Sequence, residues 1–377
     1  MLRRKTMAGA LLRAAVIVLL LCGHGFADAH PLSRGDGDLR VMTYNIDEGT
    51  EFRALVAART PTEFLLAVGD TITEVRATDP TARMEAVATQ ILAANPMLVS
   101  LQEVDQWFTG PFDLATGTCG NLTLEIDMLR DLLAALTAHG GRYAVAAHGV
   151  QRAFPATPGL VPPAGFVCAA VVNRNIILAR TDLRVSTFRW GNPQSAQFDS
   201  RAFLPTPLGP FPVTSGWASV DAVFDGRPFR FIGGHLESND ATVREQQGAE
   251  LRGGPAVTTL PLILAMDSNA QAAPAPPDPT YVDFVAAGYA DAWAEVFPRA
   301  PGSTCCQVPL VNNPVSELDQ RIDLILTLGP VHAQRVALFG ADAASMTPGG
   351  LWPSDHAGVA AQVVITGRHL GGGRSGL

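Results

Sequence analysis

Short apolar segments that each lead into a polar side chain are the feature that most constrains this chain. Residues 97–104 and 262–269 show it clearly, because an apolar run of strand length leads directly into Glu103 and into Asp267. Open sheets commonly gather ligand-binding groups where their strands end. The pattern therefore predicts a sheet-containing fold with polar side chains collected along one edge.

Helices are expected between these strands. Apolar residues recur at helical spacing over 82–94, and Asn95-Pro96 stops that helix. Similar patterns predict helices over 124–138, around 243–251 and over 281–297. No internal repeat or low-complexity linker divides the chain. We therefore expect an α/β (α+β) fold in one domain.

The clearest hairpin is predicted at 217–234, where two alternating runs flank Asp225-Gly226. Its second strand ends in two glycines followed by His235. In contrast, residues 47–80, 151–167 and 189–212 lack a clear period, and we expect irregular segments there. The proline- and glycine-rich stretch 151–167 is of the kind that shapes a substrate cleft from a long surface loop.

The N-terminal segment 1–29 is typical of a secretory signal peptide. A basic start precedes an apolar run over 8–21, and Ala27-Asp28-Ala29 supplies the small-x-small cleavage pattern. An uncleaved anchor and a lipoprotein modified at Cys22 are the alternatives, although Leu21 is not the small residue that lipidation expects. We therefore expect a secreted or periplasmic protein with no membrane span after cleavage, a domain over 38–367 and a flexible glycine-rich tail over 368–377.

The charge of the chain disfavours broad nucleic-acid binding. Loss of residues 1–29 removes four basic residues and one acidic residue, which changes the formal net charge from −8 to −11. No lysine remains in that mature chain. Non-specific nucleic-acid binding usually requires an extended basic surface. In this chain, only a local patch of arginines could bind a nucleic acid.

Four cysteines remain after residue 29: Cys119, Cys168, Cys305 and Cys306. An even number in an exported chain favours disulfides. Because neighbouring cysteines rarely bridge each other, we expect Cys305 and Cys306 to pair with Cys119 and Cys168. A zinc site is the competing interpretation, but no Cys-x-x-Cys spacing supports it.

The polar residues at the predicted strand ends are of types that serve phosphate-ester chemistry. Carboxylate and amide oxygens suit Mg²⁺, and an imidazole oriented by a carboxylate can take a proton from water. Taken singly, each of these residues is more often solvated than catalytic. They are Asn45, Glu103, His235, Asp267, Asn269, Asp323, Asp355 and His356.

Together these residues resemble the motifs of the endonuclease/exonuclease/phosphatase superfamily, which includes deoxyribonuclease I and the neutral sphingomyelinases. The matching motifs occur in the family order over residues 38–367: Tyr44-Asn45, Gln102-Glu103, Gly234-His235-Leu236, Asp267-Ser268-Asn269, Arg321-Ile322-Asp323 and Ser354-Asp355-His356. Met266 stands where the family usually has glycine before its Asp-x-Asn motif. The resemblance implies a four-layer α/β/β/α sandwich with two mostly antiparallel sheets packed face to face.

The resemblance also implies a divalent metal site. Glu103 is the expected first ligand, with Asn45 beside it and Asp355 on the same ion. Mg²⁺ is the expected cofactor, with Mn²⁺ as an alternative.

Catalytic roles follow from the same resemblance. His356 is the expected general base, and Asp323 orients its ring. Asp267 positions the water or helps to deprotonate it, Asn269 donates to a phosphoryl oxygen, and His235 protonates the leaving oxygen or binds phosphate. Whether Asp267 or His356 is the formal base remains open at this point.

The predicted function is therefore that of a secreted, Mg²⁺-dependent phosphoesterase that hydrolyses phosphodiesters. Arg174 and Arg201 are candidates to bind the substrate phosphate, since guanidinium groups pair well with phosphate. The substrate is a nucleic acid, a phospholipid such as sphingomyelin or a small phosphodiester, and residues 154–166 are a candidate lipid-facing segment. A non-catalytic secreted binding module on the same fold is the further alternative, and no stable protein partner is implied.

Overall fold

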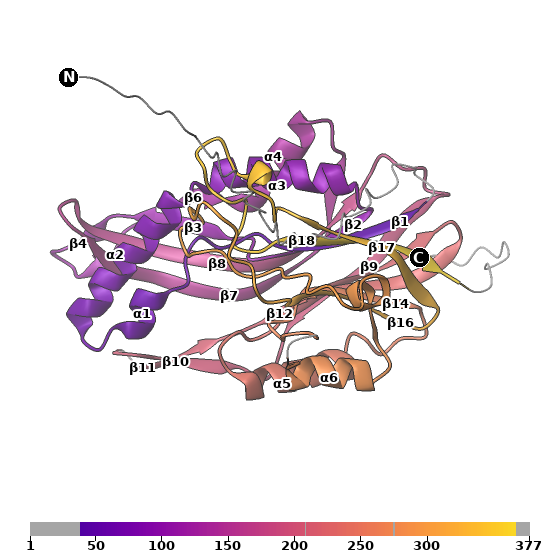
Figure 1. Ribbon diagram of the computed structural model, residues 1–377. Coiled ribbons are helices and arrows are strands. Elements are labelled where there is room, and N and C mark those ends of the chain that lie inside the picture. The colour runs from indigo at the N-terminus through magenta and orange to yellow at the C-terminus, as the bar shows by residue number, and fades with distance from the viewer. Residues whose placement is uncertain (1–37, 208, 274–275, 367–377) are drawn as a thin grey trace, which may run out of the picture.

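The protein is a sandwich of two β-sheets with helices on both outer faces. The computed structural model describes residues 38–366 apart from residues 208, 274 and 275, so the predicted signal peptide 1–29 and the tail 368–377 lie outside the described residues. Figure 1 shows α3 and α4 above one sheet, and α5 and α6 below the other. The predicted four-layer α/β/β/α fold is confirmed.

The first sheet contains eight strands, and β7 pairs only with β8. In spatial order they are β17 (Val331–Phe339), β18 (Gly358–Ile365), β1 (Leu39–Asn45), β2 (Leu98–Gln102), β8 (Gly165–Arg180), β3 (Gln106–Gly110) and β6 (Thr123–Asp127), with β7 (Tyr143–Val161) beside β8. All pairings are antiparallel except that between β1 and β2.

The second sheet contains six strands, and two short hairpins lie outside both sheets. In spatial order the strands are β15 (Ala290–Asp291), β16 (Asp323–Leu328), β14 (Leu262–Asp267), β13 (Arg227–His235), β12 (Gly216–Phe224) and β9 (Phe188–Gln197). The hairpins are β4 (Phe112–Asp113) with β5 (Thr118–Cys119), and β10 (Ala202–Thr206) with β11 (Gly209–Val213).

The helices cover the outer faces of the sheets and one end of the sandwich. They are α1 (Arg53–Ala57), α2 (Pro61–Ala77), α3 (Pro80–Ala94), α4 (Met128–Ala138), α5 (Ala241–Gly253), α6 (Pro279–Ala286) and α7 (Ala292–Val296), with a 3₁₀ turn, η1, at Ala343–Ser345. Within the described residues, no helix has both the length and the apolar character needed to cross a membrane.

The principal core lies between the sheets. Val41 and Leu98 of the first sheet belong to the same fully buried cluster as Phe231 and Ile263 of the second. Burial of an aliphatic or aromatic side chain of this size contributes roughly 1.5–3 kcal/mol, so this layer fixes the face-to-face packing. Separate clusters seat α3 and α4 on the first sheet and α5 and α6 on the second.

Helix α3 shows why the helical periodicity was readable. Asp79 caps its start by accepting a hydrogen bond from the Ala82 N–H, and Asn95 ends it in the left-handed conformation. Met84 and Ile91 on its inner face are fully buried against the first sheet. The prediction of a helix over 82–94 is confirmed.

The prediction of an irregular segment over 47–80 is wrong, because both α1 and α2 lie there. A capping box starts α2: the Thr60 hydroxyl accepts from the Glu63 N–H, and the Glu63 carboxylate accepts from the Thr60 N–H. Its buried face is made of small or β-branched residues such as Ala67 and Ile72. These weaken the apolar signal that helical periodicity depends on.

The predicted loop over 151–167 is also wrong, because these residues form the outer part of the long β7–β8 hairpin. Pro155 lies in β7 where its register with β8 shifts, between Phe154 and Thr157. Proline is tolerated at such irregularities and on edge strands, because it has no N–H to donate to a ladder. Likewise, residues 189–212 hold most of β9 together with β10 and the start of β11.

Two predicted helices are shorter than expected. Residues 123–127 form β6, and α4 begins only after Asp127, which caps it. In the helix predicted over 281–297, α6 ends at Ala286. Gly288 then adopts a positive φ, and β15 and α7 follow.

The expected pairing of Cys305 and Cys306 with the other two cysteines is wrong. Cys119 is bonded to Cys168, which ties the β4–β5 hairpin to β8, and Cys305 is bonded to its neighbour Cys306. The reason is position: Cys168 lies on β8, whereas Cys305 and Cys306 lie in the loop that leads toward β16.

Removal of the Cys119–Cys168 bond is expected to destabilise the protein by about 2–4 kcal/mol, since the bond closes a separation of 49 residues. The measurement is the guanidinium midpoint of Cys119→Ser, Cys168→Ser and the double variant. Each single variant already breaks the bond, so all three should lose a similar amount. An unchanged midpoint in the double variant would contradict the prediction.

Candidate functional site

The ends of strands from both sheets meet at one end of the sandwich. His235 at the end of β13 is the register partner of Asp267 at the end of β14, and Asp267 is the partner of Asp323 at the start of β16. From the other sheet, Asn45 at the end of β1 donates its Nδ2 proton to Asp267 Oδ2 at 3.0 Å. This hydrogen bond joins the two sheets at the site.

His356 lies against a buried carboxylate. Its Nδ1 is 2.8 Å from Asp323 Oδ2, and both side chains are almost wholly buried. A proton on Nδ1 is therefore donated to Asp323, which leaves Nε2 as the free ring nitrogen. That Nε2 lies 3.9 Å from Asp267 Oδ2 and 4.0 Å from Asp355 Oδ2. The imidazole thus presents a basic nitrogen beside two carboxylates.

Asp267 lies between two imidazole rings. Its Oδ2 is 3.3 Å from His235 Nε2 as well as 3.9 Å from His356 Nε2. Its Oδ1 accepts the Asn269 backbone N–H at 2.9 Å. His235 Nδ1 is buried and has no hydrogen-bond partner among the described residues. A carboxylate held in this way can orient a water molecule that contacts both rings.

The predicted metal ligands form an acidic group around Glu103. Glu103 Oε1 accepts from Asn45 Nδ2 at 3.0 Å, and Glu103 Oε2 accepts the Glu48 N–H at 2.8 Å. Burial raises the pKa of Asp355 well above its ordinary value, and the charges of Asp47 and Glu103 raise it further, although His356 opposes the shift. Asp47, Glu103 and Asp355 therefore place more negative charge here than the nearby positive side chains neutralise.

These residues fit a hard divalent cation. Oxygen donors from carboxylates and an amide are the ligands that Mg²⁺ prefers, and the uncompensated charge would be neutralised by a bound cation. A second acidic set lies alongside, since Asp267, Asp323 and His356 bring their donor atoms within 4.8 Å of one another. The residues present are consistent with the metal that the sequence motifs imply.

The backbone at the site adopts strained conformations. Asp47, Glu103 and Asn269 have φ values of 60°, 58° and 49°. Non-glycine residues in this region cost about 1–3 kcal/mol each and cluster where a site requires them. Here they turn the chain directly after β1, β2 and β14, which directs the side chains of these turns toward the strand ends.

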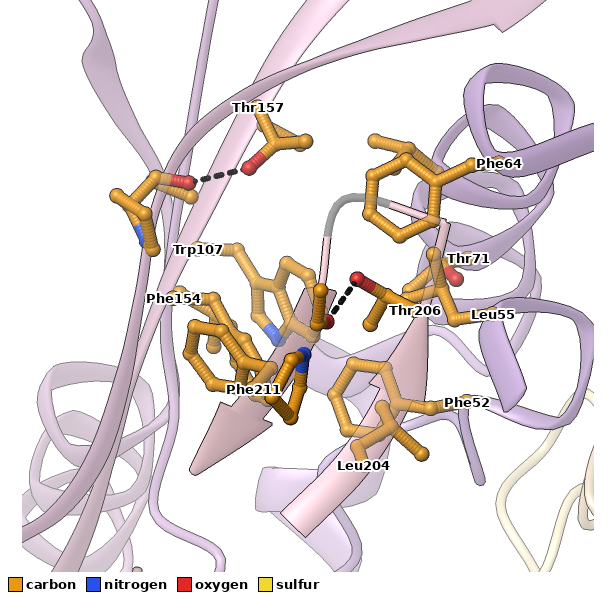
Figure 2. Close-up of a pocket in the computed structure, with 17 residues that line it drawn as sticks. Phe52, Leu55, Phe64, Thr71, Trp107, Phe154, Thr157, Leu204, Thr206 and Phe211 are labelled. Atoms are coloured by element: carbon orange, nitrogen blue, oxygen red, sulfur yellow. Dashed lines mark hydrogen bonds between the residues drawn. The ribbon is translucent and has the colours of Figure 1, made fainter. Parts of the chain in front are cut away.

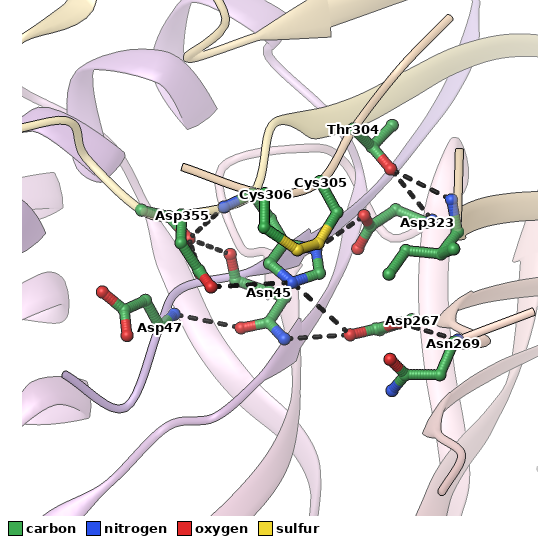
Figure 3. The surroundings of a disulfide bond; sticks show 12 residues. Asn45, Asp47, Asp267, Asn269, Thr304, Cys305, Cys306, Asp323 and Asp355 are labelled. Atoms are coloured by element: carbon green, nitrogen blue, oxygen red, sulfur yellow. Dashed lines mark hydrogen bonds and ion pairs between the residues drawn. A yellow bond between two sulfur atoms is a disulfide. The ribbon is translucent and has the colours of Figure 1, made fainter. Parts of the chain in front are cut away.

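A cleft of about 690 Å³ opens over these groups. Its lining includes Glu103, His235, Asp267, Asp355 and His356. Figure 3 shows Asn45, Asp267 and Asp355 around the same space. The structure therefore brings together the eight predicted metal-binding and catalytic residues, with Asp323 supporting His356 from behind and Asn269 on the cleft wall.

The two predicted phosphate-binding arginines are not part of this cleft. Arg174 donates to Asp127 Oδ1 at 3.1 Å and to the Val104 carbonyl oxygen at 2.9 Å, so its guanidinium has a structural role. Arg201 is exposed and contacts the Asp199 carbonyl oxygen. Neither lines the cleft within the part of the chain that the structure describes.

Two arginines that the sequence analysis did not select are in the lining, Arg53 and Arg152. Arg152 of β7 is nearly buried and forms an ion pair with Glu48. The sequence signal was weak, because Arg152 belongs to a segment expected to be a loop. Glu48 was discoverable, since it stands three residues after Asn45.

Arg83 is a further residue that was missed. Its side chain is fully buried and donates to the carbonyl oxygens of Ile46, Asp47 and Pro353. It also lies 3.2 Å from Asp47 Oδ2. Arg83 therefore ties the turn after β1 to the turn before His356. The sequence did contain a signal for this role, because Arg83 lies on the apolar face of the helix predicted over 82–94.

The Cys305–Cys306 pair also lines the cleft (Figure 3), and its sulfur atoms lie within 4.8 Å of a ring nitrogen of His356. Cys305 forms an isolated β-bridge with His356. Backbone hydrogen bonds from Gln307 to the Asp355 carbonyl oxygen and from Ala357 to the Thr304 carbonyl oxygen flank this bridge, so the loop holds the His356 turn in place.

Comparisons with known proteins identify solved structures that have a similar fold. No family model and no curated protein matches the sequence. Among solved structures, a Bacteroides thetaiotaomicron endonuclease/exonuclease/phosphatase family protein matches with a TM-score of 0.54 and 17% identity, covering 87% of this chain and 98% of that one.

Two other solved structures support the same result. The mannosyl-6-phosphatase Bt3783 of B. thetaiotaomicron matches with a TM-score of 0.51 and 17% identity, covering 86% of this chain and 99% of that one. A Leptotrichia buccalis endonuclease/exonuclease/phosphatase family protein matches with a TM-score of 0.51 and 11% identity, over the same shares of the two chains. The chain therefore has the fold of the endonuclease/exonuclease/phosphatase proteins.

Proposed function

We propose that this protein is an exported, divalent-metal-dependent phosphoesterase that hydrolyses small phosphodiesters. The observation that carries the proposal is a group of side chains from both sheets: hydrogen bonds join Asp323 to His356 and join Asn45 to both Asp267 and Glu103, and His356 Nε2 lies 3.9 Å from Asp267 Oδ2. The shared fold with a protein named as a mannosyl-6-phosphatase supports phosphate esters as the substrate class.

The residues divide the reaction between them. Asp267 orients a water molecule, whose oxygen attacks phosphorus while His356 Nε2 takes its proton. Asp323 keeps the opposite ring nitrogen protonated and stabilises the imidazolium that forms. The P–O bond to the alcohol then breaks, and His235 donates a proton to the leaving oxygen. We favour His356 as the base, because its Nδ1 is already committed to Asp323.

The reaction also requires a positive charge near the phosphoryl oxygens, and a bound metal ion would supply it. A divalent cation held by Glu103, Asp355 and Asn45 would stabilise the negative charge that develops on the phosphoryl oxygens. Mg²⁺ suits this donor set, and Mn²⁺ is the alternative to test.

The charge of the cleft favours a small substrate over a polynucleotide. Its lining contains acidic residues well outside the catalytic group, including Glu51, Glu237, Glu317 and Asp319, against Arg53 and Arg152. A polynucleotide is bound mainly through its phosphates by basic side chains. A substrate with a single phosphate avoids most of this repulsion.

The test uses the protein recovered from the exported fraction of producing cells, where its first residue is expected to be His30. It is assayed against bis-p-nitrophenyl phosphate and plasmid DNA, with Mg²⁺, with Mn²⁺ and with EDTA. We expect hydrolysis of the small diester that EDTA abolishes and added metal restores, with little cleavage of DNA.

Turnover that is insensitive to EDTA would overturn the proposed mechanism. No turnover of any phosphate ester with either metal would favour a binding module on this fold. Protein that retains residues 1–29 would overturn the proposal of export through a cleaved signal peptide.

A further inference from the structure

Figure 2 shows a second cavity, of about 230 Å³, which shares part of its wall with the catalytic cleft. Phe52, Leu55, Phe154 and Leu204 line both spaces. The rest of its lining is almost entirely apolar and includes Phe64, Val68, Trp107, Ala170, Val171 and Phe211. We call this second cavity the apolar pocket.

Four pieces of the chain build the apolar pocket: the α1–α2 segment, strand β3 with Trp107, the β7–β8 hairpin and the β10–β11 hairpin. Their aromatic rings are in contact. The centroid of Phe154 lies 4.7 Å from that of Phe211 and 5.4 Å from that of Phe52, and Phe52 stacks on Trp107 at 6.3 Å. Contacts of this kind hold the wall together.

The hydroxyl protons in the apolar pocket are already engaged. Thr71 Oγ1 donates to the Ala67 carbonyl oxygen, and Thr157 Oγ1 donates to that of Pro155, both at 2.8 Å. Thr206 Oγ1 likewise donates to a backbone carbonyl oxygen within its own hairpin, at 2.7 Å. The lining threonines therefore offer no free donor to a ligand.

Trp107 is the exception to this apolar character. It is 2% exposed, and its indole Nε1 has no hydrogen-bond partner among the described residues. A buried N–H without a partner is unfavourable, because the group has lost its hydrogen bond to water. A bound group that brings one acceptor oxygen into the apolar pocket would remove this cost.

We propose that the apolar pocket binds one hydrocarbon arm of the phosphodiester substrate, so that the substrate is a monomeric amphiphile with its phosphate in the catalytic cleft. The proposal rests on the proposed phosphoesterase function and specifies its substrate class. Continuity of the two spaces through Phe52, Leu55, Phe154 and Leu204 gives the arm a direct path from the phosphate.

The polarity and the volume of the apolar pocket indicate which kind of substrate arm it can hold. A nucleobase would bury several polar groups against a wall that offers one free donor, which leaves them unsatisfied. Size excludes a long lipid tail: a protein cavity of about 150 Å³ holds one benzene ring, so 230 Å³ suits an aryl group or a short alkyl or acyl chain.

The test is a series of p-nitrophenyl alkyl phosphates with methyl, butyl, octyl and hexadecyl arms, each assayed below its micellar concentration with Mg²⁺. All four release the same p-nitrophenolate, so only the arm varies. We expect kcat/KM to rise about three- to fourfold per methylene, as transfer of a methylene out of water predicts. The rise should stop once the chain fills the apolar pocket, by octyl.

Matched variants on one strand locate the effect. Leu204 lines the apolar pocket, whereas its neighbour Phe203 is 60% exposed. Leu204→Ala should lower the octyl-to-methyl ratio of kcat/KM by at least tenfold, and Phe203→Ala should leave this ratio unchanged. Ala170→Phe, which fills the apolar pocket from β8, should also abolish the preference, and thermal melting verifies that each variant is folded.

The possible results separate the two proposals. If the wild type does not cleave the methyl ester with metal, the proposed function fails, and this inference fails with it. If it cleaves methyl and octyl esters equally well, the inference alone is overturned. Cleavage of the hexadecyl ester only when it is embedded in phosphatidylcholine vesicles would also overturn it, because the substrate would then be taken from a membrane surface.

Discussion

His356→Asn should lower kcat on bis-p-nitrophenyl phosphate by about 10²- to 10⁴-fold, the range that one general base contributes. Asparagine is uncharged and small enough to remain in the site beside Asp323, but it has no basic nitrogen to take the proton from water. Steady-state kinetics with saturating metal gives the value. Because the loss is in the chemical step, KM should change much less than kcat.

Two further substitutions serve as controls for His356→Asn: one at Asp323, which contacts the ring, and one at an exposed histidine. If Asp323 acts by orienting the ring, Asp323→Asn should cost little further activity in the His356→Asn background, since residues that act as a unit are not additive. His332→Asn, at an exposed histidine, should leave kcat unchanged. Full activity in His356→Asn would eliminate His356 as the base and leave Asp267 as the candidate.

Glu103→Gln should abolish the stabilisation that a bound metal gives to the protein. A ligand at 100 times its Kd stabilises the folded state by about 2.7 kcal/mol, so the wild type should melt at a clearly higher temperature in Mg²⁺ than in EDTA. The amide keeps the shape of the side chain but removes one negative oxygen donor. Thermal melting across a metal titration measures the difference without any substrate.

The EDTA arm of this experiment tests the electrostatic argument separately. Loss of solvent is the largest cause of the raised pKa of Asp355, and the charge of Glu103 raises it further, because the two carboxylates repel each other. Without metal, Glu103→Gln should therefore be at least as stable as the wild type. Glu245→Gln, at an exposed position on α5, is the matched control. An undiminished metal shift in Glu103→Gln would exclude Glu103 as a ligand.

The substrate argument depends on parts of the chain that carry no catalytic residue. The α1–α2 segment and the outer β7–β8 and β10–β11 hairpins build most of the apolar pocket, and Arg152 enters the cleft from β7. These are the segments in which the secondary-structure predictions failed. Small residues on the buried face of α2 and prolines in an edge strand both obscure the periodic signals.

What the sequence determined by itself is local. The apolar runs, the turn at Asp225-Gly226 and the caps of α3 depend on neighbouring residues, so β1, β2, β12, β13, β14 and α3 were predictable. The polar residues that follow those strands were readable for the same reason, and their order matched the motifs of a family. The four-layer sandwich was implied by that resemblance, and the predicted helices and strands were compatible with it.

Only the tertiary structure decided which polar groups meet. Asn45 and Asp267 are 222 residues apart and hydrogen-bond across the two sheets, whereas Arg174, in the middle of β8, is held by Asp127 away from the cleft. The bonding of the cysteines and the apolar pocket were decided in the same way. Contacts between distant segments depend on how the sheets stack and on where long hairpins fold back, and no local pattern in the chain encodes either.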